Sequence, residues 1–598
     1  MKKFLGKFIS LTTLVLCLAV EGASAFVAGS SNKTTTCEIV EADFGSQNNY
    51  SLTASNEKSQ SQSGLADGIY DISSLSQSEK VSLGVDNYLY GYIKVDAGKV
   101  NEYSLYQIVD GKMLNCTKKD NSEYSYSFAQ NNFYNVANFG ATGDGVTDDT
   151  VAIMDAVEAV KQTGGILYFP TANYKVSILT ENSSLIYLNT SNVVLVDFMG
   201  STLTLCANGF YKYNIVKTDG CNNVIIQNGN IIGDKEIHDY SGEGYYSNGV
   251  KKVHDEGIGI YFYNVVDGMA FNMNIGFMTG DSIKVRADGY SDVSTNGTVM
   301  IDECDLHDNR RQGVTILNSY IVKVYNTEIY RIGNYGTVKG ASPMAGIDVE
   351  PDAGTFTVFR VYVSYTNIYD TTGYGVIANT TPNPFGRLQV EFLDMYKCNI
   401  ETPAVNKCSA RWTTFNFVPK YNEQGNYMGV TLFRLFAYNC NYNIDLGGKT
   451  LYIEEGRMGN CHVTGVDNTR VGGCGNLQIQ STMLYDNVFE NLTGDNTFTN
   501  GGNATKQFGI LFGIGGKTLD AETKSNKFVN CALYVRGENH LSGSIIDNSY
   551  ALFRYSMTID GLTAINSTLR AESNSYILLG APTITNCTIL LPNRFVFV

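Results

Sequence analysis

The stretch 136–150 reads VANFGATGDGVTDDT, and it precedes an apolar-periodic run, VAIMDAVEAVKQT at 151–163, and the segment GGILYFP at 164–170. A first strand ends in the Gly-Asp-Gly turn and leads into a helix, which we expect Asp148 or Thr147 to cap. The apolar residues of this helix fall on one face: Ile153, Met154, Val157 and Val160. Two glycines end the helix, and the next strand stops at a proline. One helix before many strands indicates a cap on the end of a coil.

Three acidic residues lie close together in this stretch, as the carboxylates of a catalytic cluster do: Asp144, Asp148 and Asp149. Their places in the turn and at the start of the helix favour a structural role instead. Carboxylates at such positions accept backbone N–H groups, so we expect them to hold the turn and cap the helix.

The segment NFGATGDGVTDDTVAIMDAVEAV…GGILYFP closely resembles the N-terminal motif of the pectate lyase superfamily. That superfamily includes rhamnogalacturonase-like hydrolases, epimerase-like proteins and phage tailspikes. The resemblance spans residues 134–177 and implies an all-β fold, a right-handed, single-stranded parallel β-helix with an N-terminal capping helix. The motif is specific for this fold and does not select one reaction.

Three regions are expected along the chain. Residues 1–25 resemble a signal peptide, because lysines precede an apolar core and Ala23-Ser24-Ala25 offers a cleavage site, so we expect a secreted protein. Residues 26–130 predict a small β-rich module or a spacer. Residues 131–598 predict the β-helix, since a strand-turn rhythm recurs there at about 25–33 residues, a period typical of solenoids.

The composition fits this reading and limits the partners. The chain has 60 Gly, 40 Tyr and 9 Pro, as many short strands with tight turns require, and its net charge is −15. A polyanionic substrate would therefore need a locally basic groove. The sequence contains no nucleotide-binding loop, zincin motif or nucleic-acid signature, and no apolar segment after the signal peptide is expected to span a membrane. The oligomeric state is left open.

Twelve of the 13 cysteines lie outside the predicted signal peptide, an even number that is compatible with disulfides. Their context favours free structural thiols, because small apolar residues that alternate along strands belong on the inner wall of a β-helix. A metal site is disfavoured because the chain has no CxxC pair. The cysteines in strand-like frames are Cys304, Cys398, Cys440, Cys461, Cys531 and Cys587.

Five strands align by hand across the middle of the chain: 257–261, 282–286, 313–317, 346–350 and 375–379. Alternation along a strand then directs two residues of each to the core and the residues between them outward. The predicted core residues are Ile258 and Ile260, Ile283 and Val285, Val314 and Ile316, Ile347 and Val349, and Val376 and Ala378.

The outward positions of these strands carry the candidate chemistry. Asp348 and Glu350 lie two residues apart on one strand, so their Cα atoms are separated by about 6.5–7 Å. Inverting glycosidases hold their two carboxyl groups at this separation or wider, with a water between. Asp281, one step back on a neighbouring strand, is the third candidate catalytic acid.

Basic, amide and aromatic side chains near these acids predict a groove for an acidic sugar chain. The candidate substrate-binding residues are Lys284, Arg286, Arg310, Arg311, Gln312 and Tyr261. His254 and His307 are better explained as turn residues than as proton carriers. Trp412, the single Trp, fits the core better than a sugar platform.

The candidate site departs from two better-known relatives. Polygalacturonase-like hydrolases carry a tandem Asp pair, whereas TGDSIKVR at 279–286 is only a partial echo, with Ser282 where the second Asp would stand. The Asp-Pro-His motif of the alginate epimerases is also missing.

Three functions remain open from the sequence. The leading hypothesis is a secreted glycoside hydrolase in which Asp348 and Glu350, or Asp281, act as acid and base. The first alternative is a polysaccharide lyase or epimerase acting on uronic-acid polymers, with Lys284, Arg286 or Arg310 as the base. We expect no cofactor or bound metal, except for Ca²⁺ in the lyase case. The second alternative is a glycan-binding protein without catalysis, similar to a tailspike or an adhesin.

Overall fold

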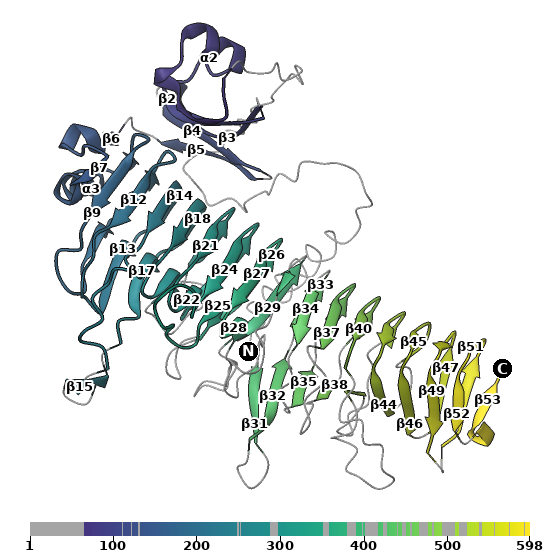
Figure 1. Cartoon of the computed structure of the whole chain (residues 1–598). Helices are drawn as coiled ribbons and strands as arrows, with labels where there is room; N and C mark the ends of the chain where they lie inside the picture. The colour runs from purple at the N-terminus through teal and green to yellow at the C-terminus, as the bar shows by residue number, and fades with distance from the viewer. Residues whose placement is uncertain are drawn as a thin grey trace, which may run out of the picture.

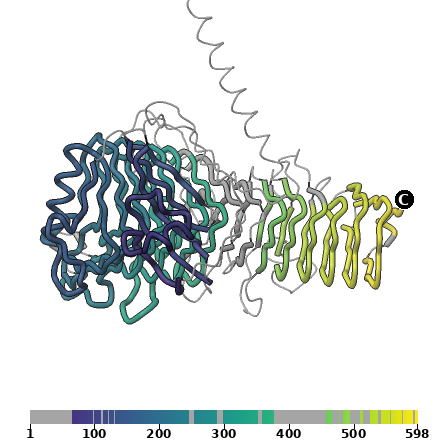
Figure 2. Tube along the Cα trace, turned by 90° about the horizontal axis from the view of Figure 1, so that it is seen from above, coloured from purple at the N-terminus to yellow at the C-terminus, as the bar shows by residue number. Residues whose placement is uncertain are grey.

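The computed structural model describes residues 65–598 with gaps, the longest being 288–296, 351–357, 379–389, 401–416, 466–475, 493–508 and 513–522. The described part is mostly β-structure, in which parallel strands stack into a β-helix whose coils follow one another along one axis (Figures 1 and 2). Helices α2 (Gln77–Leu83) and α3 (Thr150–Thr163) are its α-helices. None of the described helices is long and apolar enough to cross a membrane. The predicted signal peptide, Trp412, Cys398 and Cys440 lie outside the described residues.

The acids of the N-terminal motif hold its turn. Asp144 accepts the N–H groups of Val146 and Thr147 at 2.8 and 2.7 Å, and Asp148 accepts that of Thr150 at 3.0 Å. The structural interpretation of these acids is therefore confirmed. The N-cap residue is Asp149 rather than Asp148 or Thr147, and its carboxylate accepts N–H groups from the preceding turn instead of capping the helix.

Helix α3 packs against the first coil through β8 (Gly165–Tyr168) and β10 (Ser184–Leu188). Its buried face contains Ile153, Ala156, Val157 and Val160. Gly165 adopts φ +116°, and a Cβ there would lie 2.2 Å from the carbonyl oxygen of Asn132, so only glycine fits at this strand start.

Seven parallel strands form the sheet that positions the candidate site. Neighbours in this sheet come from successive coils, so residues far apart in sequence lie side by side. In spatial order they are β10, β13 (Lys212–Asp219), β17 (Glu256–Tyr263), β19 (Asp281–Arg286), β22 (Gln312–Ile316), β25 (Ala345–Val349) and β28 (Tyr374–Ala378).

A second, larger parallel sheet closes the coils on the other side, and a nine-stranded sheet continues the C-terminal half. The strands of the larger sheet that face the seven-stranded sheet are β14 (Asn223–Ile232), β18 (Asp267–Gly276), β20 (Thr298–Asp302), β21 (Asp305–His307), β23 (Ser319–Tyr325), β24 (Glu328–Ile332), β26 (Val358–Ser364) and β27 (Asn367–Thr371). The nine-stranded sheet begins at β31 (Phe417–Tyr421) and ends at β52 (Thr588–Leu590).

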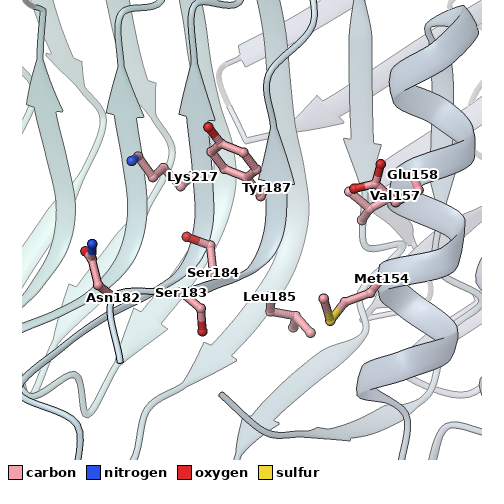
Figure 3. Close-up of a pocket in the computed structure, with 9 residues that line it drawn as sticks. All are labelled: Met154, Val157, Glu158, Asn182, Ser183, Ser184, Leu185, Tyr187 and Lys217. Atoms are coloured by element: carbon pink, nitrogen blue, oxygen red, sulfur yellow. The ribbon is translucent and has the colours of Figure 1, made fainter. Parts of the chain in front are cut away.

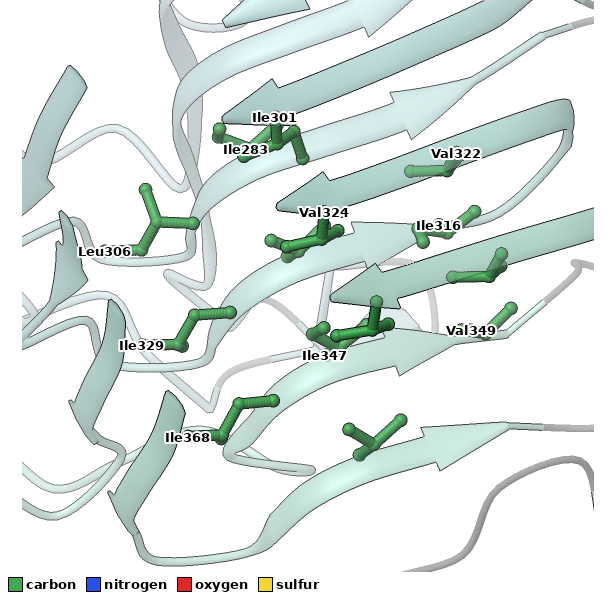
Figure 4. Close-up of a cluster of buried hydrophobic side chains, with 14 of the residues drawn as sticks. Ile283, Ile301, Leu306, Ile316, Val322, Val324, Ile329, Ile347, Val349 and Ile368 are labelled. Atoms are coloured by element: carbon green, nitrogen blue, oxygen red, sulfur yellow. The ribbon is translucent and has the colours of Figure 1, made fainter. Parts of the chain in front are cut away.

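The core lies between these sheets and is built from stacked aliphatic rows (Figure 4). Ile283, Val314, Ile347 and Val376 pair in register and are fully buried, as predicted. The hand alignment of the 257–261 strand is wrong by two residues, because Ile260 rather than Ile258 pairs with Ile283. A shift of two keeps every side chain on its predicted face, so hydrophobic alternation could not reveal it.

Five antiparallel strands form a separate N-terminal module: β1 (Gly68–Asp71), β2 (Tyr90–Asp96), β3 (Lys99–Val109), β4 (Lys112–Lys119) and β5 (Ser122–Phe128). The module packs on the larger sheet of the β-helix (Figure 1). The buried Asp197 of β11 (Val194–Asp197) accepts hydrogen bonds from Tyr106 and from Ser104, the latter at 2.7 Å. Tyr124 donates to Asp302 of β20.

The seven cysteines in the described ranges are all free thiols. Cys304, Cys461 and Cys531 are buried in the core of the coils, which confirms the structural interpretation for these three. Burial raises the pKa of Cys304 and of Cys531 to about 12. These thiols therefore act as small apolar residues.

Candidate functional site

One outward row crosses the seven-stranded sheet from strand to strand. Because parallel strands lie about 4.8 Å apart, residues in register along this row are neighbours on the surface of the sheet. From β10 to β25 the row reads Tyr187, Lys217, Tyr261, Lys284, Thr315 and Asp348. Glu350 follows β25 directly, and its backbone N–H continues the ladder to the carbonyl of Ile316 at 3.0 Å.

Glycines place extra polar side chains beside this row. Strict alternation would turn Gln312 inward, as it does Val314. Instead Gly313 faces the interior, since a Cβ there would lie 2.4 Å from Ile329 Cγ2, and the side chain of Gln312 reaches the outer side. Gly346 repeats this arrangement against Ile368 on the next coil. The local kink therefore adds Gln312 to the outer side of β22, whereas the matching residue before Gly346 is the apolar Ala345.

Asp281, Asp348 and Glu350, here called the carboxyl cluster, are linked by amide and hydroxyl groups. Gln312 Nε2 donates to Asp348 Oδ2. The Thr315 hydroxyl lies 2.8 Å from Asp281 Oδ2 and also contacts Gln312 Oε1. Its one hydrogen can serve only one of these acceptors. A protonated Asp281 would donate to Thr315, which could then donate to Gln312, and all contacts would be satisfied.

Burial governs the ionisation of the cluster. Asp348 is 2% exposed and Asp281 is fully buried, whereas Glu350 is exposed. Burial raises the pKa of Asp348 well above its usual range, and the charge of Glu350 and a hydrogen bond between the two carboxyl groups raise it further. Burial also raises the pKa of Asp281, against the opposing effect of Arg311. Asp348 and Asp281 therefore hold their protons at pH values where ordinary carboxylic acids have lost them.

Arg311 is the cation of the cluster. Its Nη1 lies 3.4 Å from Asp281 Oδ2, and its Nε lies 3.8 Å from Asp255 Oδ2. Burial alone would lower the pKa of Arg311, but the surrounding acids raise it, Asp281 first. Two buried atoms, Asp281 Oδ1 and Arg311 Nε, have no hydrogen-bond partner among the described residues. The site thus contains one buried acceptor and one buried donor that no hydrogen bond uses among the described residues.

Lys284 and Tyr261 extend the site along the row. Lys284 is 9% exposed, and its Nζ lies 5.5 Å from the centroid of the Tyr261 ring. Burial works against ionisation of Glu256, but Lys284 and Lys212 overcome it and lower the pKa of Glu256. Arg286 follows on the same strand and pairs in register with Tyr263. The structure thus brings Tyr261, Lys284, Arg311 and Gln312 together with the carboxyl cluster.

Arg310 does not join the site, which corrects the expectation from the sequence. Its side chain is buried and donates to the carbonyls of His254 and Lys339, at 2.8 and 2.9 Å, and to Glu243 at 2.5 Å. Its guanidinium also stacks on Tyr240 at 4.6 Å. Neighbouring arginines in the turn point to different partners, and nothing in the dipeptide distinguishes them.

Sequence reasoning also missed a buried polar chain beneath the loop that leads to β17. His238 Nδ1 lies 2.7 Å from Asp234 Oδ2, and its Nε2 lies 2.8 Å from His254 Nδ1. Tyr213 donates to the other oxygen of Asp234. His254 is thus fixed inside the loop, and His307 is held by Asp308 and Asn274. Asp234 and His238 lie four residues apart, but their partners Tyr213 and His254 lie 21 and 16 residues away and leave no local signal.

A family model described as rhamnogalacturonase A/epimerase, pectate lyase-like, matches residues 133–234. An uncharacterised protein of Bacillus subtilis (strain 168), YclG, is 26% identical over 228 residues, which are 36% of this chain and 37% of that protein. Alginate lyase 7 of Azotobacter vinelandii is 44% identical over 79 residues, 13% of this chain and 9% of the lyase. The chain therefore matches well under half of the length of these curated relatives.

Among solved structures, the A-module of mannuronan C-5 epimerase AlgE4 of Azotobacter vinelandii aligns with 78% of this chain and all of that module, with a TM-score of 0.31 and 12% identity. Tailspike gp49 of Acinetobacter baumannii bacteriophage Fri1, a capsular polysaccharide depolymerase, aligns with 83% of this chain and 71% of its own, with a TM-score of 0.33 and 11% identity. The family model matches the segment whose motif predicted it. Residues 133–234 are therefore similar to the pectate lyase-like family that the N-terminal motif resembles.

Proposed function

We propose that this protein is a polysaccharide-processing enzyme that moves protons at the carboxyl cluster, and that its substrate is a uronic-acid polymer cleaved by a lyase reaction or inverted by an epimerase reaction. The observation that carries the proposal is the buried Asp348, whose pKa is raised by burial and by the neighbouring Glu350, close to the cation Arg311. The sequence matches to an alginate lyase and to mannuronan epimerases support the same chemistry.

Both reactions begin by removing the proton from the carbon that bears the sugar carboxylate. The electron pair left behind spreads into that carboxylate, whose charge must be neutralised. Arg311 supplies a positive charge, and Asp348, with its raised pKa, supplies a proton for a hydrogen bond. Lys284 or Tyr261, in the same row, is placed to act as the base.

The second half of the reaction decides the product. When the carbon–oxygen bond at the neighbouring carbon breaks, the electron pair forms a carbon–carbon double bond, and the leaving oxygen takes a proton from the cluster. When a proton instead returns to the same carbon from the opposite face, the product is the epimer. Epimerisation needs a base and an acid on opposite faces of the sugar ring, whereas elimination needs a base at that carbon and an acid at the leaving oxygen.

The described residues contain no group of three or more His, Cys, Asp or Glu side chains arranged to hold a metal ion. We assign charge neutralisation to Arg311 and to the carboxyl group of Asp348.

A glycoside hydrolase remains the second candidate, with a changed assignment. An inverting pair needs room for a water between its carboxyl groups, whereas Asp348 and Glu350 are hydrogen-bonded to each other. The raised pKa of Asp281 favours it as the general acid, with the exposed Glu350 as its partner. Secretion after cleavage behind Ala25 belongs to both candidates, and N-terminal sequencing of the exported protein tests it.

A polysaccharide panel separates the candidates. Pectic, alginate-like and bacterial surface glycans are treated with the wild type, with Asp348→Asn and Glu350→Gln, and with the distant control Asp547→Asn. Unsaturated, ultraviolet-absorbing ends that appear with the wild type and the control alone support the lyase. Reducing ends without unsaturation would establish hydrolysis instead. Retained glycan without either product would indicate a binding protein.

A further inference from the structure

A cavity of about 350 Å³ lies in the corner between α3 and the outer face of β10 (Figure 3). One wall is α3, which contributes Met154, Val157 and Glu158. The opposite wall comes from β10 and the turn before it, and Leu185 provides an apolar floor opposite Met154. Its volume is in the range of small-ligand sites.

The cavity is lined by one lysine without an ion-pair partner. No carboxylate of the described residues lies within ion-pair distance of Lys217, whose Nζ is 4.9 Å from the ring of Tyr263 and 5.7 Å from that of Tyr187. The other charges nearby are engaged. Glu158 pairs with Lys161 at 2.7 Å, and the hydroxyl of Tyr187 donates to Asp219 at 2.9 Å. A bound anion would find its counter-charge at Lys217.

Lys217 connects the cavity to the carboxyl cluster. It lies next to Tyr261 in the outward row, with its Nζ 5.8 Å from that ring, and the row continues through Lys284 to Asp348. Five strand spacings separate β10 from β25, a distance of about 24 Å. An extended oligosaccharide of several residues bridges this distance, and its rings can stack on the tyrosines.

We propose that the cavity is the terminal subsite for an anionic oligosaccharide, in which Lys217 binds the carboxylate or sulfate of the last sugar residue. This inference rests on the proposed function, because it places the reacting residue at the carboxyl cluster. The wall formed by α3 stops the glycan at the cavity, so the glycan binds by one of its ends. Products are therefore short and uniform in length.

Binding of oligomannuronates and oligogalacturonates of two to eight residues tests the subsite. In the Asp348→Asn background, calorimetry should show affinity rising about tenfold at the length that reaches from the cluster to the cavity. Lys217→Gln should abolish this rise and leave the affinity for the shortest oligomers unchanged. Lys527→Gln, an exposed lysine on a distant strand, should behave like the parent.

Two further experiments complete the test. Met154→Trp, which fills the cavity without changing its charge, should remove the length-dependent rise in affinity, and a melting curve establishes that the variant is folded. Oligomers with reduced carboxyl groups should not show this rise, whereas sulfated oligomers should show it. An equal length dependence in Lys217→Gln and its parent would overturn the subsite. A wild type that makes neither product but keeps the Lys217-dependent rise would overturn the proposed function and leave the subsite standing.

Discussion

Asp348 is a carboxylic acid that its surroundings keep from ionising. Its side chain is buried, accepts a hydrogen bond from Gln312 and shares one with Glu350. Two negative charges in such contact repel strongly, and this repulsion adds to burial in raising the pKa of Asp348. Asp348 therefore offers a proton donor next to an exposed carboxyl group, a combination that general acid and base catalysis uses.

Replacing Asp348 by Asn should change the pH dependence of stability. The folded state raises the pKa of Asp348, so it binds the proton more tightly than the unfolded chain does. Wild-type stability must then fall as pH rises from about 3.9, the unfolded value, towards the raised value. Asn stays neutral, so its advantage over Asp should grow by about 1.4 kcal/mol per pH unit in this window. Denaturant unfolding of both proteins across this pH range measures it, and a constant difference would contradict the account.

The buried thiols should be nearly inert in the folded protein. With a pKa of about 12, Cys304 and Cys531 have a thiolate population on the order of 10³ smaller at pH 8 than an ordinary thiol. Their alkylation by iodoacetamide, followed by mass spectrometry of each peptide, should be slower by at least that factor than after unfolding. The half-buried Cys587 is the internal comparison. Rapid labelling of Cys304 in the native state would disprove its place in the core.

At the scale of the strand, alternation predicts which residues are buried but not the kink that builds the site. The aliphatic rows at Ile283, Val314 and Ile347 follow directly from the period of two. The outward turn of Gln312 does not, because it requires Gly313 to face the core against Ile329. A small residue recurs at the position of Gly313 in successive strands. That recurrence is the feature of the sequence from which the kink could be predicted.

Gly313→Ala should therefore damage both the fold and the site. The added methyl group would lie 2.4 Å from Ile329 Cγ2 and 2.6 Å from the carbonyl oxygen of Gly346, which cannot move without breaking the ladder. We expect a loss of about 1–3 kcal/mol in stability. Denaturant unfolding measures it against Gly242→Ala, where the nearest atom, His254 Nε2, is 3.6 Å away. Equal stabilities for the two variants would exclude the proposed kink.

Partners across coils were predictable only where the register was regular. The sequence placed Asp281, Gln312 and Asp348 together because their strands align without insertion. It could not separate Arg311, which enters the site, from Arg310, which binds the loop before β17. That choice depends on loop contacts formed only after the coils stack.

At the scale of the molecule, a polar interface joins the N-terminal module to the β-helix. Asp197, on the larger sheet, is fully buried and accepts from Tyr106 and Ser104 of the module and from Gln227 of the next coil. Burial raises the pKa of Asp197, and these donors offset part of that effect. Strand alternation predicted a β-rich module but not where it docks, because Asp197 lies 93 residues from Ser104 and 91 residues from Tyr106 in sequence.

Tyr106→Phe should loosen this docking. It removes one donor to the buried Asp197 and leaves the ring in place, at a cost of about 1–3 kcal/mol. Hydrogen exchange should accelerate in β3 and β4 while the distant strands of the β-helix are unaffected. Tyr103→Phe on the same strand removes only an exposed hydrogen bond to Glu123 and serves as the control. Equal exchange in both variants would contradict the role of the Asp197 interface.

The central claim is that the carboxyl cluster moves a proton at the carbon that bears the sugar carboxylate. Incubation of oligomannuronates and oligogalacturonates in D₂O, followed by NMR, tests it most directly, because hydrolysis breaks no carbon–hydrogen bond. The wild type and Asp547→Asn should introduce deuterium at that carbon or create unsaturated ends, and Asp348→Asn and Glu350→Gln should do neither. New reducing ends with that carbon–hydrogen bond intact, or deuterium that enters equally with Asp348→Asn, would contradict the account.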